Sequence, residues 1–174
     1  GDVYKRQVLD KNNLHKGIST IVIGDANIGK LMSADKRIPL VSATGSTRMG
    51  KSVGEVVGKR LGKSLLELGG NNAVILTPNA DLKMVIPALV FGAVGTTGQR
   101  CTSTRRLIIH EDIYQNVKTA MVNAYNQLRI GDPLDEYNHV GPLIDQDAVK
   151  MYLDAIQAAK LEGGNVVVEG GQLS

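Results

Sequence analysis

The chain has 174 residues, of which 43% are hydrophobic and 21% are charged, and its formal net charge is +3. These values are ordinary for a globular protein, and because lysines and arginines are interspersed with acidic residues, the charge pattern argues against nucleic-acid binding. No apolar run reaches the length of a membrane span, and the single cysteine, Cys101, excludes an internal disulfide and favours a reducing, cytoplasmic compartment.

Apolar runs and helical periodicities alternate along the chain, and together they predict its elements. The expected strands span residues 19–23, 38–43, 64–68, 73–76, 106–109 and 165–168, and the expected helices span residues 26–34, 46–61, 80–98, 112–130 and 145–161. Asp81 stands near the start of the third helix as a cap, and Pro87 is expected to kink or interrupt that helix. The alternation of strands and helices predicts an α/β fold with a parallel sheet.

Both ends of the sequence suggest a piece of a longer protein. Residues 1–7 resemble neither a capped helix nor a targeting peptide, and we interpret them as non-native residues without function. The last expected strand is followed almost at once by the chain end, whereas a parallel strand is expected to be followed by further elements. We therefore expect the chain to be an internal fragment.

The segment GSTRMGKS at residues 45–52 matches the phosphate-loop pattern G-x-x-x-x-G-K-[ST]. A strand, a glycine turn and a helix N-terminus form an anion site for a triphosphate or a dinucleotide pyrophosphate alike. Residues 24–31 nearly repeat the pattern, and the best downstream acidic strand end is interrupted by His110, which argues against a triphosphate with magnesium. Alternatively, the glycines serve only to let the helix pack closely against a neighbouring backbone. Glycines recur at every fourth position and form one stripe, whose members are Gly50, Gly54, Gly58 and Gly62.

Cys101 lies in a polar and cationic segment between an expected helix and an expected strand. The neighbouring Arg100, Arg105 and Arg106 favour the thiolate form and an exposed sulfur. The alternative is a small buried apolar residue. His110 lies nine positions further, beyond a strand, so a cysteine–histidine hydrolase is weakly supported.

Glu67 ends an apolar strand just before two glycines. Burial there would favour its protonated form, which suits a general base that works near neutral pH. A structural ion pair with Lys63 or Arg60 explains the position equally well.

Three segments, VSATGSTRMG, LLELGGNNAVI and FGAVGTTGQRCTSTRRLIIH, resemble in this order the NAD(P)-dependent aldehyde dehydrogenase superfamily. The ELGG of Glu67 is followed 34 positions later by Cys101, and that spacing is highly specific. Four shorter motifs are most similar to the α-aminoadipic semialdehyde (Δ1-piperideine-6-carboxylate) dehydrogenase branch, also called antiquitin: ELGGNN, GQRCT, RIGDPLD and GPLID.

The resemblance implies a role for each matching residue. Cys101 matches the catalytic nucleophile, whose backbone amide helps to hold the oxyanion, and Glu67 matches the base that activates water. The implied cofactor-binding residues are Gly45, Ser46 and Gly50 at the pyrophosphate, Met49 near the adenine, and Leu68 and Gly69 near the nicotinamide; the implied substrate-binding residues are Arg100 and Thr102. The match of Lys51 and Ser52 to the phosphate loop would then be a coincidence, and no metal is implied.

The resemblance also implies domains and partners. Residues 8–68 correspond to the end of a Rossmann-type NAD-binding domain, and residues 69–174 to the start of the α/β catalytic domain. The cofactor is NAD, with NADP not excluded, the substrate is a small aldehyde, and the full-length protein is a homo-oligomer, either a dimer or a tetramer. Family members carry further cofactor and substrate residues outside the matched segments, so we expect the isolated chain to be inactive. The alternatives are a P-loop nucleotide hydrolase and a non-catalytic nucleotide-binding module.

Overall fold

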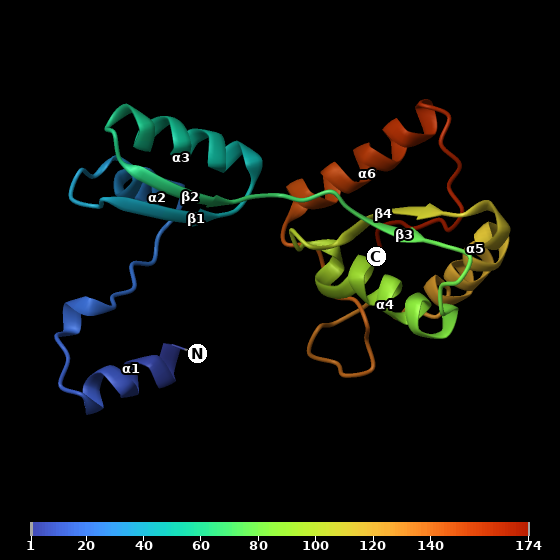
Figure 1. Cartoon of the computed structure of the whole chain (residues 1–174), viewed down its shortest axis with the longest axis horizontal. Helices are drawn as coiled ribbons and strands as arrows, with labels where there is room; N and C mark the ends of the chain where they lie inside the picture. The colour runs from blue at the N-terminus through green and yellow to red at the C-terminus, as the bar shows by residue number, and fades with distance from the viewer. Residues whose placement is uncertain (1, 174) are drawn as a thin grey trace. The chain divides into compact units, whose positions relative to one another are not determined.

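The computed structural model describes residues 2–173, and the chain divides into two compact units between Leu68 and Gly69 (Figure 1). The elements of the first unit are α1 (Asp2–Lys11), a 3-10 turn η1 (Lys16–Ile18), α2 (Ala26–Ala34), β1 (Leu40–Thr44), α3 (Thr47–Lys59) and β2 (Lys63–Glu67). The elements of the second unit are β3 (Asn72–Leu76), α4 (Leu82–Val94), η2 (Gly95–Gly98), β4 (Thr104–Ile109), α5 (Glu111–Tyr125) and α6 (Gln146–Leu161).

In the first unit, β1 and β2 pair in parallel, and α3 forms the crossover between them (Figure 1). The register joins Leu40 to Lys63 and Thr44 to Glu67, so both strands end at the same edge. Val57 on α3 is almost fully buried and anchors the helix. Arg60 at the end of α3 donates from Nε to the Ser33 carbonyl at 2.8 Å, which ties α3 to α2.

The glycine stripe on α3 has two different halves. A Cβ at Gly50 would lie 2.5 Å from a Leu68 methyl, and one at Gly54 would lie 3.7 Å from Leu66. A Cβ at Gly58 would meet nothing within 4 Å. The expected close packing therefore holds for the N-terminal half of the helix, where α3 approaches the end of β2.

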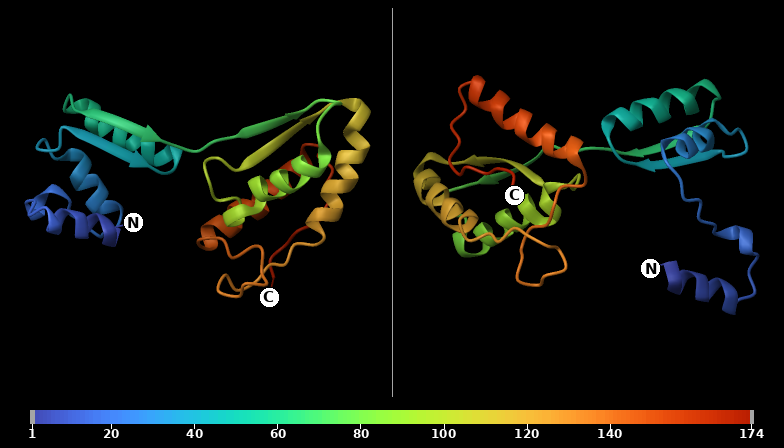
Figure 2. Two further views of the ribbon diagram at one scale, coloured as in Figure 1. Left: turned by 60° about the horizontal axis from the view of Figure 1, so that its bottom comes forward. Right: turned by 180° about the vertical axis from the view of Figure 1, so that it is seen from behind.

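In the second unit, β3 and β4 also pair in parallel, with α4 between them in the sequence (Figure 2). The core is centred on Leu76, Leu89 and Val117, which come from β3, α4 and α5. Partly buried apolar residues surround it: Val74, Ala80, Leu82, Val85, Ile86, Leu107, Ile109, Ile113 and Met121. Both strands and two helices of the second unit thus share a single apolar cluster.

The helix boundaries follow their capping residues. The Asp81 carboxylate accepts from the Lys83 amide, as the sequence predicts, and Asp145 caps α6 in the same way. The expected interruption at Pro87 is wrong, because α4 continues through it to Val94. His110 caps α5 by accepting from the Asp112 amide, which explains a histidine at a strand end.

Two expected strands are absent from the described residues. Residues 19–23 and 165–168 are irregular, and Ile21, Val22 and Ile23 are well exposed. A buried strand needs a neighbouring strand to hydrogen-bond with, and β1, β2, β3 and β4 pair only as β1–β2 and β3–β4. The alternation of helices with parallel strands is otherwise as predicted.

Within residues 2–173, no helix is long and apolar enough to cross a membrane.

Substitution Val117→Ala should lower the free energy of unfolding of the second unit by about 1–3 kcal/mol, because it leaves a cavity at a fully buried position. Thermal unfolding monitored by circular dichroism measures this loss. Val167→Ala is the matched control, since Val167 is 49% exposed and its change should alter the midpoint little. Equal effects of the two substitutions would contradict this account of the core.

Arg37 donates to the Asp35 carboxylate at 2.6 Å and lowers the pKa of Asp35 to about 2. Because the folded-state pKa is depressed, this interaction stabilises the fold above the ordinary carboxyl pKa and is lost as the pH falls from about 4 towards 2. Arg37→Ala should therefore raise the pKa of Asp35 in an NMR titration. Arg48→Ala should leave it unchanged.

Candidate active site

The glycine turn between β1 and α3 lies beside the end of β2. The Gly45 amide donates to the Glu67 carbonyl at 3.0 Å, which continues the strand pairing by one residue. Ser46 caps α3, and its Oγ accepts from the Met49 amide at 3.1 Å. A Cβ at Gly45 would lie 2.8 Å from Cε of Met49, so the Met49 side chain already covers the turn. A side chain at position 45 would displace that methyl group.

The geometry of the turn argues against a triphosphate loop. Helix α3 begins at Thr47, inside the matched pattern, and the Gly50 amide already donates to the Ser46 carbonyl at 2.9 Å. A phosphate loop surrounds its ligand with backbone amides from the residues between the two glycines. Here those residues are helical, and of the first-turn amides in the described structure, those of Thr47 and Arg48 have no acceptor. The turn can therefore offer a helix N-terminus to an anion but cannot surround a triphosphate.

Glu67 is the last residue of β2, and its side chain is exposed. The expected burial of this carboxylate is wrong, because no element of the described chain covers the end of β2. The alternative ion pair is wrong as well: neither Lys63 nor Arg60 forms a salt bridge with it, and Arg60 binds the Ser33 carbonyl instead. The carboxylate is accessible to water.

Cys101 is exposed, so the alternative of a small buried apolar residue is wrong. It lies in a tight turn closed by the Ser103 amide, which donates to the Arg100 carbonyl at 3.1 Å. The Arg100 amide donates in return to Oγ of Ser103 at 3.2 Å, and Ser103 is only 1% exposed. The buried serine therefore holds the base of the turn while the thiol faces solvent.

The neighbouring arginines bind backbone carbonyls. Arg100 donates to the Phe91 carbonyl at 3.3 Å, and its guanidinium lies 5.1 Å from the centre of the Phe91 ring. Arg105 donates to the Gly98 carbonyl at 3.0 Å, and Arg106 donates to the Asn71 carbonyl at 2.7 Å. These cations shape the segment around Cys101, and a role of Arg100 in substrate binding stays a prediction.

The segment before Cys101 is strained and braced. Thr96 and Thr97 have φ values of 54° and 57°, a left-handed conformation that is costly for β-branched residues. Thr97 donates from Oγ1 to the Gly141 carbonyl at 3.0 Å. Oε1 of Gln99 accepts from the Ile144 amide at 2.9 Å. Residues 141–144 therefore hold the strained segment in place.

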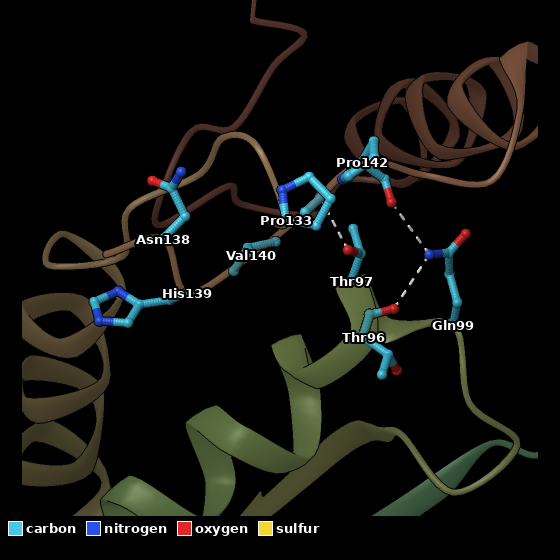
Figure 3. A pocket seen from close by; sticks show the side chains of 9 residues that line it. Thr96, Thr97, Gln99, Pro133, Asn138, His139, Val140 and Pro142 are labelled. Carbon is cyan, nitrogen blue, oxygen red and sulfur yellow. Dashed lines mark hydrogen bonds between the residues drawn. The ribbon is translucent and has the colours of Figure 1, made fainter. Parts of the chain in front are cut away.

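A pocket of about 330 Å³ lies where these two segments meet (Figure 3). Its lining residues are Thr96, Thr97, Gln99, Pro133, Asn138, His139, Val140, Gly141 and Pro142. Cys101 is not among them, so this hollow is separate from the exposed thiol. Sequence reasoning missed the bracing role of Gln99 and Thr97, because their partners are more than 40 positions away in the chain.

The predicted site residues fall into two groups. The first unit brings Gly45, Ser46, Met49 and Glu67 together at the ends of β1 and β2, with Gly50 packed on Leu68. The second unit holds Arg100, Cys101 and Thr102 in one turn, and Gly69 starts the segment that leads into β3. Within residues 2–173, no three side chains among His, Cys, Asp and Glu gather closely enough to hold a metal ion.

Residues 4–174 match the model of the aldehyde dehydrogenase family. The chain belongs to this family. It is 49% identical over 164 residues to the α-aminoadipic semialdehyde dehydrogenase of Mus musculus. The aligned region covers 94% of this chain and 30% of the mouse protein. The chain therefore spans about a third of the length of the curated relatives that it matches.

Solved structures of aldehyde dehydrogenases have the same fold. A succinic semialdehyde dehydrogenase from Streptococcus pyogenes, in complex with NADP+, aligns with a TM-score of 0.87 at 31% identity, over 97% of this chain and 37% of its own. A mutant aldehyde dehydrogenase from Pseudomonas syringae, in complex with NAD+ and octanal, aligns with a TM-score of 0.81 at 28% identity, over 87% and 31% respectively. The predicted aldehyde dehydrogenase-like α/β fold is thereby confirmed.

Gly50→Ala should destabilise the first unit by about 1–2 kcal/mol, because the new methyl group would force Leu68 away from α3. Gly58→Ala on the same helix should instead stabilise it by up to about 1 kcal/mol, since nothing lies near that position and alanine favours helix. Paired thermal melts measure the difference. Destabilisation of similar size in both variants would refute the close approach at Gly50.

Proposed function

We propose that this chain supplies the nucleophile, the base and the pyrophosphate turn of an NAD(P)-dependent aldehyde dehydrogenase. The observation that carries the proposal is the presentation of Cys101, which is exposed in a hydrogen-bonded turn. Within the described structure, the amides of Cys101 and Thr102 have no acceptor, so they are free to bind an oxyanion. Family membership adds the reaction class.

The turn before α3 fits a dinucleotide pyrophosphate. The 13-residue helix α3 begins directly after this glycine turn, and the amides of Thr47 and Arg48 in its first turn have no acceptor within the described structure. The relatives solved with NAD+ and with NADP+ support either dinucleotide. The bound dinucleotide would supply the hydride acceptor of the reaction.

The chain's own residues would carry the other steps. The Cys101 thiolate adds to the aldehyde carbon, and the resulting thiohemiacetal oxyanion accepts from the Cys101 amide. Loss of hydride leaves a thioester on Sγ. Glu67 then takes a proton from water, whose oxygen attacks the thioester and releases the carboxylic acid and the thiolate. The exposure of both side chains supports these roles.

The substrate is proposed to be a semialdehyde that also carries a carboxylate, namely α-aminoadipic semialdehyde. The name and 49% identity of the mouse relative support this choice. Arg100 and Thr102 flank the nucleophile and are proposed to contact the carboxylate, while residues 8–68 and 69–174 are proposed to belong to the cofactor and catalytic domains. The full-length protein is proposed to be a homo-oligomer.

Two substitutions separate the proposed nucleophile from the proposed base. They are made in a full-length chimera in which this chain replaces the matching segment of the mouse relative. Glu67→Gln should retain a burst of about one NADH per active site but lose steady turnover, because thioester hydrolysis stops. Cys101→Ser should abolish the burst as well. Rapid-mixing absorbance at 340 nm measures both. Full activity of Cys101→Ser would favour a non-catalytic nucleotide-binding module.

The isolated chain is expected to show no steady NADH production, because it contains only about a third of the length of its relatives. It should also bind ATP no better with magnesium than without, since α3 begins inside the phosphate-loop pattern. Calorimetric titration with Mg-ATP and with NAD+ makes the comparison. Magnesium-dependent ATP binding that Lys51→Ala abolishes would establish the P-loop alternative instead.

A further inference from the structure

Asn72, the first residue of β3, reaches across to the turn that carries Cys101. Its Nδ2 donates to the Cys101 carbonyl at 2.7 Å and to the Ser103 carbonyl at 3.1 Å. This inference rests on the proposed function. We propose that Asn72 is the positioning residue of the nucleophile: it fixes the peptide unit that follows Cys101 and the one that follows Ser103, and it thereby holds the turn so that the thiol and the oxyanion-binding amides face the substrate.

Hydrogen bonds hold the carbonyls of both peptide units that flank Cys101. The Arg100 carbonyl accepts from the Ser103 amide, and the Cys101 carbonyl accepts from Asn72. A trans peptide is planar, with its N–H pointing opposite to its C=O. Holding the two carbonyls inward therefore turns the amides of Cys101 and Thr102 outward. Neither amide donates to any described residue.

The absence of a side chain at Gly70 makes room for the same carbonyl. A Cβ at Gly70 would lie only 2.2 Å from the Cys101 carbonyl oxygen, which is a backbone atom that cannot rotate away. The same Cβ would lie 3.0 Å from Nδ2 of Asn72. Glycine at position 70 therefore leaves the space in which the Cys101 carbonyl accepts from Asn72.

An irregularity in the sheet allows Asn72 to reach this turn. The register pairs Asn72 with Thr104 but Ala73 with Arg106, so the β4 strand has one extra residue at this point. Such a bulge re-aims side chains. An asparagine also has the required chemistry, because one short side chain carries two N–H donors, whereas aspartate has only acceptors.

The first test is hydrogen exchange in the full 174-residue chain. Asn72→Asp keeps the shape of the side chain but removes both donors, and Asn71→Asp adds the same charge one residue earlier. The Ser103 amide closes the turn, and in Asn72→Asp it should exchange at least about 10-fold faster than in the unsubstituted chain. In Asn71→Asp its exchange rate should be unchanged. Unchanged exchange in both variants would overturn the proposal.

The second test is steady-state kinetics in the chimera described above. Asn72→Asp should lower kcat by about 100-fold with KM within about threefold, because the aldehyde still binds while the reacting atoms are misplaced. Asn71→Asp should change neither constant by more than about threefold. A rise in KM with kcat unchanged would overturn the positioning role, since loose structure alone would weaken binding.

The outcomes distinguish this inference from the proposed function. If the unsubstituted chimera makes no NADH, or if its Cys101→Ser variant keeps full activity, the proposed function fails. Hydrogen exchange of the Ser103 amide still reports on the contact from Asn72 in that case. If the amides of the whole second unit exchange fast in Asn72→Asp, the unit has unfolded. The Asn72→Ser variant then tests whether residue 72 holds the turn. The Asn72→Ser variant keeps one donor, so the Ser103 amide should remain partly protected from exchange. If this variant loses all protection in the turn alone and still has normal activity, the proposal is overturned.

Discussion

The structure depends on one constraint, which is that two parallel strands must be joined by a crossover. In the first unit, the helix α3 must start at the edge where β1 ends and return the chain to the opposite edge. The glycine turn therefore lies beside the end of β2, and the Gly45 amide meets the Glu67 carbonyl. In the second unit, the return through η2 brings Cys101 to the edge where β3 begins, next to Gly70 and Asn72. Site residues gather because of this connection.

Much of this arrangement is visible in the sequence, because its signals are local. The caps Asp81 and Asp145, the alternation of strands and helices, and the glycine turn at Gly45 each depend on residues only a few positions apart. Burial is different, since it depends on whatever distant segment covers a residue. The carboxylate of Glu67 and the apolar run at residues 19–23 were expected to be buried, and no described element covers either of them.

The hydrogen bonds that brace the segment around Cys101 could not be predicted from the sequence for a related reason. Asn72 and the Cys101 carbonyl are 29 positions apart, and Gln99 and the Ile144 amide are 45 positions apart. No periodicity marks a side chain that binds a carbonyl, and every residue carries the same carbonyl. The left-handed φ of Thr96 and Thr97 is equally hidden, because threonine rarely adopts it without outside support. These features follow from the tertiary fold and lie around the exposed Cys101.

The pairing of strands in twos has a consequence for handling the protein. Every one of β1, β2, β3 and β4 has a neighbour on one side only, so each exposes a row of amides and carbonyls. Open strand edges beside exposed residues such as Ile75 and Ile108 are sites where chains of the same kind pair with one another. Aggregation is therefore the main hazard during expression, and low protein concentration with rapid purification is the corresponding precaution.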